Sequence, residues 1–211
     1  MSRSCDMTTA MKLVLASASP RRQELLHQIG VQFRVVNHSI HEARRPGEPA
    51  AAFVRRMAQE KALDVLSRLA ASEPEVVLGA DTVVVLDDQV LGKPVDFEDA
   101  LRMLGLLSGR EHQVLSAVAV CDRHEMKVAL SVTVVRFRAI EPGEIAAYWQ
   151  TGEPVDKAGA YAAQGHGAVF VEHLQGSFTG VVGLPLFETA ALLASFRVRS
   201  WLPEPETGGG G

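Results

Sequence analysis

Residues 13–30 read LVLASASPRRQELLHQIG, and this stretch decides the fold that we predict. A short apolar strand is followed by a turn of small hydroxyl residues and then by a helix. Ser19 is a suitable N-cap, Pro20 suits the first helical position, and Gly30 suits the C-terminal end. The helix gains an apolar face from Leu25, Leu26 and Ile29.

Two cations, Arg21 and Arg22, occupy the first turn of this helix. A helix N-terminus carries about half a positive charge, so each arginine is repelled there by roughly 0.3–1 kcal/mol. A bound phosphate would reverse the sign of this effect, because backbone N–H groups and guanidiniums could converge on it. Two solvated arginines remain the alternative.

The composition favours a folded chain with a small anionic ligand. The 211 residues are 47% hydrophobic, which is enough for a core and excludes global disorder. The net charge of −4 and the pI near 6.0 argue against a surface that coats nucleic acid. Any cluster of cations is therefore local, and we expect no nucleic-acid partner.

Two cysteines, Cys5 and Cys121, give neither a disulfide framework nor zinc-ligand spacing, so we expect a reducing compartment. The chain has no apolar run of 18 residues and no signal peptide, which predicts a cytoplasmic protein without membrane contact. We expect a disordered leader over residues 1–10, one domain of two lobes over residues 11–200, and a disordered tail over residues 201–211.

Strands and helices alternate along the chain, which predicts an α/β fold with some antiparallel pairing. The predicted strands beyond the first are Val31–Val36, Val76–Leu86, Val90–Leu91, Gln113–Cys121, Val128–Phe137 and Ala168–Leu174. The predicted helices beyond the first are Ala50–Ala71, one from Asp96 to Leu107, one from Glu141, and a closing helix that ends near Phe196. Thr151–Gly167 reads as a long polar loop whose candidates are Asp156, Lys157 and Gln164.

Several charged residues stand where charge is costly. Asp81 interrupts an apolar strand, so it must find cations, a metal or hydrogen bonds, or cap a turn. Lys61 falls within the apolar stripe of a helix and either extends its ammonium to water or aims it into a cleft. Lys93 is held between Gly92 and Pro94, whereas Glu42 lies in a loop and reads as a solvated charge.

Known catalytic motifs are absent: the sequence has no Walker A motif, no dinucleotide-binding glycine pattern, no zinc-protease motif and no nucleophile elbow. The remaining set of cations and carboxylates fits metal-assisted hydrolysis of a phosphoric anhydride. The cations are Arg21, Lys61 and Lys93, and the carboxylates are Glu42 and Asp81.

Taken together, these residues resemble the Maf family of nucleotide pyrophosphatases. The matching segments, in family order, are Ala16–Arg22 with Glu24–Leu26, Glu60–Ala62, Gly79–Thr82, Lys93–Pro94, Leu107–Gly109 with His112 and Val114, Glu153–Pro154 with Asp156–Tyr161, Gln164–Gly165 and Val181–Pro185.

The resemblance implies a two-lobed α/β fold similar to the inosine triphosphate pyrophosphatases, with an elongated mixed β-sheet, flanking helices and a cleft between the lobes. It also implies hydrolysis of a nucleoside triphosphate to the monophosphate and pyrophosphate with a divalent cation, Mg²⁺ or Mn²⁺. We expect the protein to form a homodimer.

The family's site roles carry onto this chain by position. Asp81 matches the proton acceptor and Glu42 a second acidic position, and both are the expected metal ligands. Ser17, Arg21, Lys61 and Lys93 match positions of the triphosphate cleft. The positions that sort substrates in the subgroup acting on dTTP and UTP are matched by Arg22, Thr82 and Gln164. The alternatives are a pyrophosphatase for purine or modified nucleotides and a non-catalytic nucleotide-binding regulator of septum formation.

Overall fold

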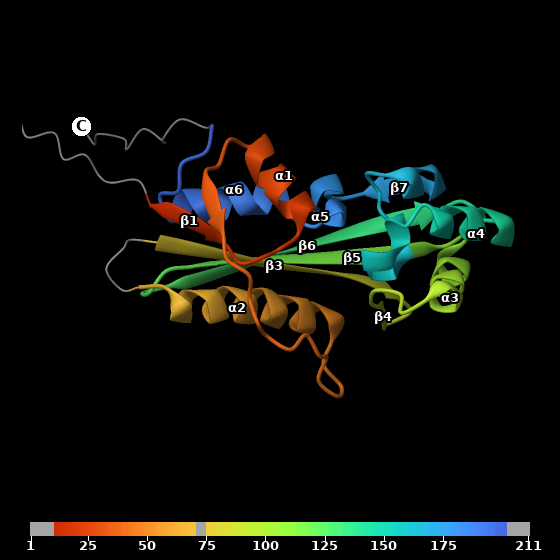
Figure 1. Cartoon of the computed structure of the whole chain (residues 1–211), viewed down its shortest axis with the longest axis horizontal. Helices are drawn as coiled ribbons and strands as arrows, with labels where there is room; N and C mark the ends of the chain where they lie inside the picture. The colour runs from red at the N-terminus through yellow and green to blue at the C-terminus, as the bar shows by residue number, and fades with distance from the viewer. Residues whose placement is uncertain (1–10, 71–74, 202–211) are drawn as a thin grey trace, which may run out of the picture.

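One mixed sheet runs through the length of the molecule (Figure 1). The computed structural model describes residues 11–70 and 75–201. Within them the strands are β1 (Lys12–Leu15), β2 (Phe33–Val35), β3 (Glu75–Leu86), β4 (Gln89–Leu91), β5 (Glu111–Cys121), β6 (Met126–Phe137) and β7 (Val171–Gln175). The order is β2-β1-β3-β5-β6-β7, and β4 pairs with β3. The contacts β2-β1-β3 are parallel and the others antiparallel, so the predicted mixed α/β sheet is confirmed.

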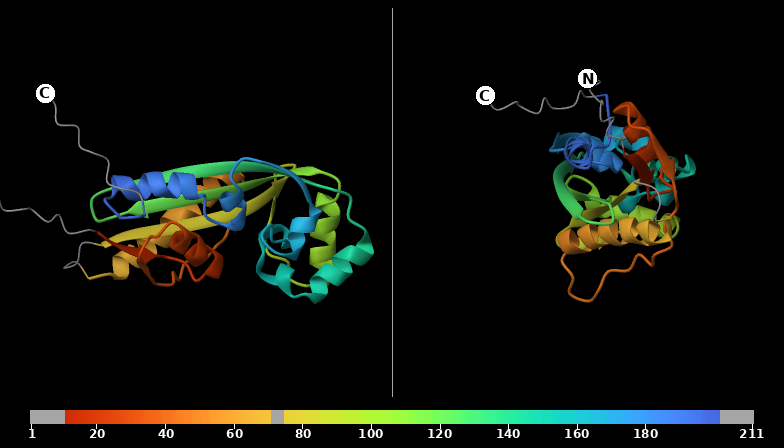
Figure 2. Two further views of the ribbon diagram at one scale, coloured as in Figure 1. Left: turned by 90° about the horizontal axis from the view of Figure 1, so that it is seen from above. Right: turned by 90° about the vertical axis from the view of Figure 1, so that its left-hand side faces the viewer.

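Helices cover both faces of this sheet (Figure 2). They are α1 (Pro20–Gln28), α2 (Ala50–Arg68), α3 (Phe97–Leu107), α4 (Pro142–Gln150), α5 (Phe178–Val182) and α6 (Leu186–Ser195). One core lies between α2 and the sheet, and a second lies between the opposite face and helices α1 and α6. A third core, at the far end of the long strands, includes α3 and α4.

The middle of β3 lacks a strand partner on one edge. Along the edge that faces away from β5, β1 pairs as far as Leu78 and β4 pairs from Val84 onward. Residues 79–83 between them have no pairing on this edge within the described residues. Side chains from both faces of β3 can therefore reach the same opening, which an uninterrupted sheet would prevent.

Gly79 sets the distance between α2 and β3. A Cβ atom at this position would lie 2.2 Å from the carbonyl oxygen of Ala58 and 2.8 Å from the amide nitrogen of Ala62, both on α2. Only glycine allows the helix backbone to approach the strand so closely. This contact brings Lys61 of α2 next to Asp81, two residues after Gly79.

In the first half of the chain the predicted N-cap of α1 is confirmed in position, and two predicted boundaries need correction. Ser19 is the N-cap of α1, but its side chain makes no capping hydrogen bond, and its own amide donates to Ser17 Oγ instead. The strand predicted over Val31–Val36 is shorter, at Phe33–Val35. Helix α2 ends at Arg68, because Leu69 adopts an extended conformation; the predicted end at Ala71 lies outside the described residues.

Three differences also occur in the second half. The segment predicted as a loop over Thr151–Gly167 contains 3₁₀ helices at Glu153–Asp156, Ala158–Ala160 and His166–Phe170. The last of them delays the following strand, predicted over Ala168–Leu174, to Val171. The closing helix, predicted to end near Phe196, is α6; a short helix that was not predicted, α5, precedes it and ends before Gly183, which has a φ of +133°.

The predicted leader, residues 1–10, lies outside the described residues, as does the predicted tail apart from Trp201. The amide of Trp201 donates to the carbonyl of Ile29. In the part of the chain that the structure describes, no helix has the length and apolar character to cross a bilayer.

Candidate active site

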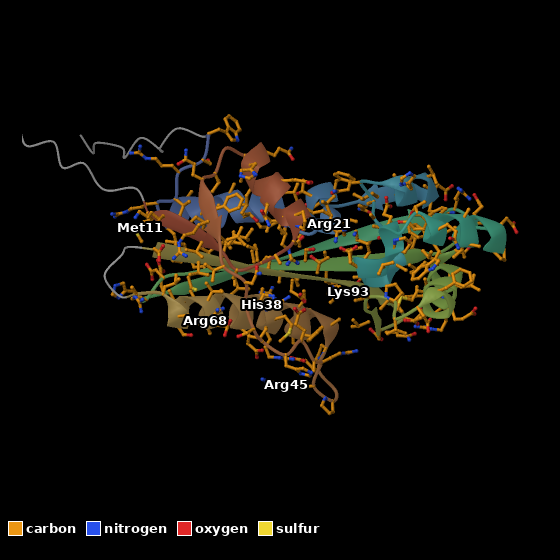
Figure 3. The ribbon with its side chains drawn as sticks, in the orientation of Figure 1. Met11, Arg21, His38, Arg45, Arg68 and Lys93 are labelled. Carbon is orange, nitrogen blue, oxygen red and sulfur yellow. The ribbon has the colours of Figure 1, made fainter. Side chains whose placement is uncertain are left out.

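A cavity of about 690 Å³ opens at the unpaired stretch of β3. Its lining includes eight of the nine site residues predicted from the sequence, namely Ser17, Arg21, Arg22, Glu42, Lys61, Asp81, Thr82 and Lys93. Figure 3 shows Arg21 and Lys93 coming from separate elements to the middle of the elongated molecule. Three segments far apart in the sequence therefore bring cations into one hollow, and two further segments bring the carboxylates Glu42 and Asp81.

On one side of β3, Lys61 holds two carboxylates. Its Nζ lies 2.8 Å from Asp81 Oδ1 and 2.9 Å from Glu42 Oε2. The Lys61 side chain is 4% exposed and that of Asp81 is 9% exposed. The ammonium therefore does not extend to bulk water, and the aspartate caps no turn. The pair lies in the wall of the cavity, in accordance with the cleft alternative for Lys61 and with the cation partner expected for Asp81.

Glu42 comes from the long connection between β2 and α2. Its side chain is 46% exposed, but one oxygen is bound to Lys61 and the other lies 3.6 Å from His38 Nε2. Burial raises the pKa of Glu42, but the attraction of Lys61, with smaller contributions from His38 and Lys93, outweighs this and leaves the pKa below its usual value. The glutamate is a paired anion at the cavity.

Two charged residues of α2, Arg56 and Asp64, hold this connection in place, and we call them the charged ladder. Arg56 donates to both carboxylate oxygens of Glu48 and, at 2.9 Å, to the carbonyl of Ala43, the residue after Glu42. One turn beyond Lys61, Asp64 accepts from the amide of Ser39 at 2.9 Å. These contacts lie on both sides of Glu42 in the sequence and define the position of its backbone.

The N-terminus of α1 contributes hydroxyl and guanidinium groups. Arg22 donates from Nε to the carbonyl of Gly183 at 2.9 Å and from Nη1 to Ser17 Oγ at 3.1 Å. Ser17 Oγ also accepts from the amide of Ser19. Both of these partners donate to Ser17 Oγ, so its proton has no acceptor among the described residues and can bind a phosphate oxygen.

The two arginines differ in their surroundings. Burial lowers the pKa of Arg22, although Asp81 and Glu42 oppose this, and it also lowers the pKa of Arg21, where Asp156 gives the largest opposing effect. Both remain charged, since an arginine is effectively always protonated. Arg22 is hydrogen-bonded to Ser17 and Gly183, whereas Arg21 lines the cavity without a hydrogen bond to any other described residue. The picture of two solvated arginines is therefore wrong for Arg22.

On the other side of β3, hydroxyl groups form a network. Thr82 Oγ1 lies 2.8 Å from Ser116 Oγ on β5 and 3.4 Å from the carbonyl of Gly183. Ser116 Oγ donates to the carbonyl of Gly180 at 2.5 Å. The network ties the cavity wall to α5 and the turn that follows it.

The far wall of the cavity includes Lys93 with Asp156 and Lys157. Lys157 pairs with Asp156, and the amide of Gly159 donates to the carbonyl of Gly92 at 2.9 Å. This bond joins the Gly92–Lys93 connection to the 3₁₀ segment. It fixes the backbone from which Lys93 extends.

Gln164 is the one predicted site residue that does not line the cavity. It is exposed, in the turn before the third 3₁₀ helix. Glu153 fixes this turn, because its carboxylate accepts from Tyr148 Oη at 2.6 Å and from the amides of His166 and Gly167 at 2.9 and 3.0 Å. These bonds help to hold the pKa of Glu153 near about 2, despite burial, which raises it.

The sequence over residues 12–196 matches the family described as Maf-like protein. The chain belongs to this family. A protein of Saccharophagus degradans named dTTP/UTP pyrophosphatase is 52% identical over 191 residues, covering 90% of each chain. A protein of Methylococcus capsulatus with the same name is 54% identical over 183 residues, covering 87% of this chain and 90% of that one.

Among solved structures, protein VC0702 from Vibrio cholerae aligns with 9% identity over 68% of this chain and 78% of that chain. The TM-score of 0.38 is too low to support an argument.

Membership of the Maf family suggests a metal-dependent hydrolase. Asp81 and Glu42 each give one oxygen to Lys61. The second oxygen of Asp81 has no hydrogen bond to another described residue, and that of Glu42 lies 3.6 Å from His38 Nε2. No cluster of three or more histidine, cysteine or acidic ligands exists within residues 11–70 and 75–201. The two carboxylates fit an ion such as Mg²⁺, which proteins bind through one or two carboxylates together with substrate phosphates. They do not form a complete protein cage.

Sequence reasoning missed two residues of the Maf cavity and its walls. His38 lies beside Glu42 and lines the cavity, and its spacing of four residues from Glu42 was the only available signal. Ser116 is 1% exposed on β5. A serine within an apolar strand carries no sequence signal of its own, since its importance depends on the strand beside it.

Proposed function

We propose that this Maf-family chain hydrolyses dTTP and UTP to the nucleoside monophosphate and pyrophosphate. The observation that carries the proposal is the meeting of Arg21 and Lys93 with the Asp81–Lys61–Glu42 cluster in one cavity. The names of the relatives, both above 50% identity, support the pyrimidine substrates.

The triphosphate binds along the N-terminus of α1. The Ser17 hydroxyl and the Arg21 guanidinium donate to phosphate oxygens there, where the helix dipole also favours negative charge. Lys93 reaches the chain of phosphates from the opposite wall. Cations on two sides fix the phosphates in line for attack, and this positioning accounts for much of the rate.

Asp81 and Glu42 would hold Mg²⁺ or Mn²⁺ at the cavity through their carboxylate oxygens. When bound, the divalent ion neutralises phosphate charge and makes a water molecule more acidic. When no phosphate is present, the positive charge of Lys61 offsets the repulsion between the two carboxylates, which can therefore lie side by side.

Asp81 takes the proton from the attacking water. The water oxygen forms a bond to the α-phosphorus, and the bond from that phosphorus to the oxygen bridging to the β-phosphorus breaks. The electron pair leaves with pyrophosphate, whose charge Arg21, Lys61 and Lys93 stabilise. General-base assistance of this kind contributes typically 10²–10⁴-fold to the rate.

Arg22 and Thr82 contact the pyrimidine in this proposal. Gln164 is exposed and outside the cavity lining, so a role in base selection would require its turn to approach the bound nucleotide. A cytoplasmic location, where nucleotide pools lie, and a homodimer belong to the same proposal.

The test is a panel of dTTP, UTP, CTP, ATP and GTP with Mg²⁺ or Mn²⁺, in which pyrophosphate and orthophosphate are measured separately. We expect pyrophosphate from dTTP and UTP, and loss of its release with a chelator. Orthophosphate as the main product, or turnover restricted to purine nucleotides, would overturn the proposal. Wild-type protein without metal serves as the control.

A further inference from the structure

The hydroxyl network beside the cavity has a fixed direction. Ser116 Oγ has a single proton, and a backbone carbonyl can only accept, so this proton is used on Gly180 at 2.5 Å. In the contact between Thr82 and Ser116, at 2.8 Å, Thr82 must then be the donor. The weaker alternative for Thr82, the carbonyl of Gly183 at 3.4 Å, is also an acceptor.

Both partners of Thr82 can therefore only accept, so its single proton is directed at them and only lone pairs on Oγ1 remain for a ligand. Ser116 is 1% exposed, so water does not compete for its hydroxyl group. The Gly183 carbonyl is itself fixed by the Arg22 guanidinium at 2.9 Å. Thr82 lines the cavity, and it meets any ligand there as a hydrogen-bond acceptor.

Uracil and thymine share one feature that cytosine lacks. Each has an N–H group at ring position 3, between two carbonyls, whereas the same ring nitrogen of cytosine is an acceptor. An acceptor on the protein therefore forms a hydrogen bond with the ring N–H of uracil or thymine. With cytosine, the lone pair of the ring nitrogen would face a lone pair of the protein acceptor. A buried polar group left unpaired is costly, and sites built in this way discriminate strongly.

We propose that Ser116 is a positioning residue for base selection, which holds the Thr82 hydroxyl as an acceptor for the ring N–H of uracil and thymine. This inference rests on the proposed function, because it assumes that a pyrimidine lies beside Thr82. Ser116 itself touches no substrate and acts through the direction of its hydrogen bond.

The experiment compares kcat/KM for UTP and for CTP in matched variants. The bases of these two nucleotides have the same ring size. In Ser116→Ala the strong acceptor for Thr82 is gone, so its hydroxyl can turn and donate to cytosine. The wild-type preference for UTP should fall at least about fivefold. Ser131→Ala is the control, since Ser131 is the cross-strand partner of Ser116 and is also buried, and it should leave the ratio unchanged.

A second pair keeps the inference testable if Ser116→Ala does not fold. Thr82→Val removes the acceptor with little change in shape and should lower the UTP preference by about 5- to 100-fold. Thr82→Ser keeps the hydroxyl group and should retain the preference for UTP over CTP. Loss of overall activity with an unchanged UTP:CTP ratio in both Ser116→Ala and Thr82→Val would overturn the inference.

Failure of the proposed function and failure of the inference about Ser116 and Thr82 give different results in these assays. If the wild-type protein hydrolyses neither UTP nor dTTP, the proposed function is wrong. If it hydrolyses both, and accepts CTP equally well, the function stands and the inference about Ser116 and Thr82 fails.

Discussion

Lys61 shows how a single side chain joins the parts of the site. Its ammonium lies between Asp81 and Glu42, which come from a strand and from an irregular connection. Two carboxylates this close would repel each other in a buried setting, and the lysine changes that repulsion into attraction. The same contact lowers the pKa of Glu42 and so favours the ionised carboxylate that a metal ligand requires.

Asp81→Asn removes the proposed base but keeps the shape of the side chain. We expect kcat for UTP to fall at least about a hundredfold, because an amide cannot accept the water proton. Steady-state release of pyrophosphate measures it. The control is Asp88→Asn, an exposed aspartate in the β3–β4 turn. Near-normal kcat in Asp81→Asn would exclude this aspartate as the base.

Lys61→Met tests the electrostatic role of the lysine through pH. Lys61 lowers the pKa of Glu42, so without it that pKa rises and the carboxylate is lost at a higher pH. The acid limb of the kcat/KM profile should move to higher pH, with activity at pH 5–6 reduced more than at pH 8. Lys61→Arg keeps the charge and should restore the limb. A profile that only scales down at every pH would contradict this role.

At the level of elements, α2 supports the site on two of its faces. Gly79 lets the helix lie against β3 and so places Lys61, whereas the charged ladder on the outer face fixes the connection that carries Glu42. Figure 3 shows Arg45 at the end of this connection, which projects away from the body of the molecule. A segment without helix or strand acquires its position from hydrogen bonds to a neighbouring helix.

Arg56→Met removes the contacts to Glu48 and to the Ala43 carbonyl. The Glu42 backbone then loses its restraint, and we expect about a tenfold loss of kcat with a higher concentration of Mg²⁺ or Mn²⁺ for half-maximal activity, since small displacements of a catalytic group are costly. Titration of the metal at saturating UTP measures both. Arg55→Met, at the exposed neighbour on α2, is the control. An unchanged metal requirement in Arg56→Met would argue against positioning.

On the scale of the whole molecule, the cavity lies between the two ends of the elongated sheet, beside the middle of β3. The N-terminus of α1 and the face of α2 form one wall, and the Gly92–Lys93 connection with Asp156 and Lys157 forms the other. Different hydrophobic cores support these walls. A nucleotide that contacts both walls therefore stabilises the folded chain as a unit.

A non-hydrolysable UTP with an α,β-imido bridge should raise Tm. At a ligand concentration of 100 times Kd the gain is about 2.7 kcal/mol, which corresponds to about 5–10 °C for a chain of this size. Differential scanning calorimetry with Mn²⁺ measures the shift. Uridine without phosphates is the control and should give a much smaller one. Equal shifts from both ligands would show that the cations on the two walls do not bind the triphosphate.

The sequence by itself determined the class of the fold, and it predicted most of the charged and hydroxyl residues that the structure brings together in one cavity. Apolar runs rich in β-branched residues predicted the long strands β3, β5 and β6, and helix signals placed α1, α2 and α3, because these are properties of neighbouring residues. Charged residues in apolar stretches, such as Asp81 and Lys61, also indicated a partner, because burying an unpaired charge costs free energy.

Only the tertiary structure decided which residues are the partners of these polar side chains. The unpaired stretch of β3, the approach of α2 at Gly79 and the direction of the hydrogen bonds from Thr82 through Ser116 to Gly180 depend on elements distant in the chain. Local preference also failed at Thr151–Gly167, where Glu153 organises 3₁₀ turns through long-range bonds. Pairing between remote segments has no signature in the spacing of one sequence, since it arises only when packing brings the groups together.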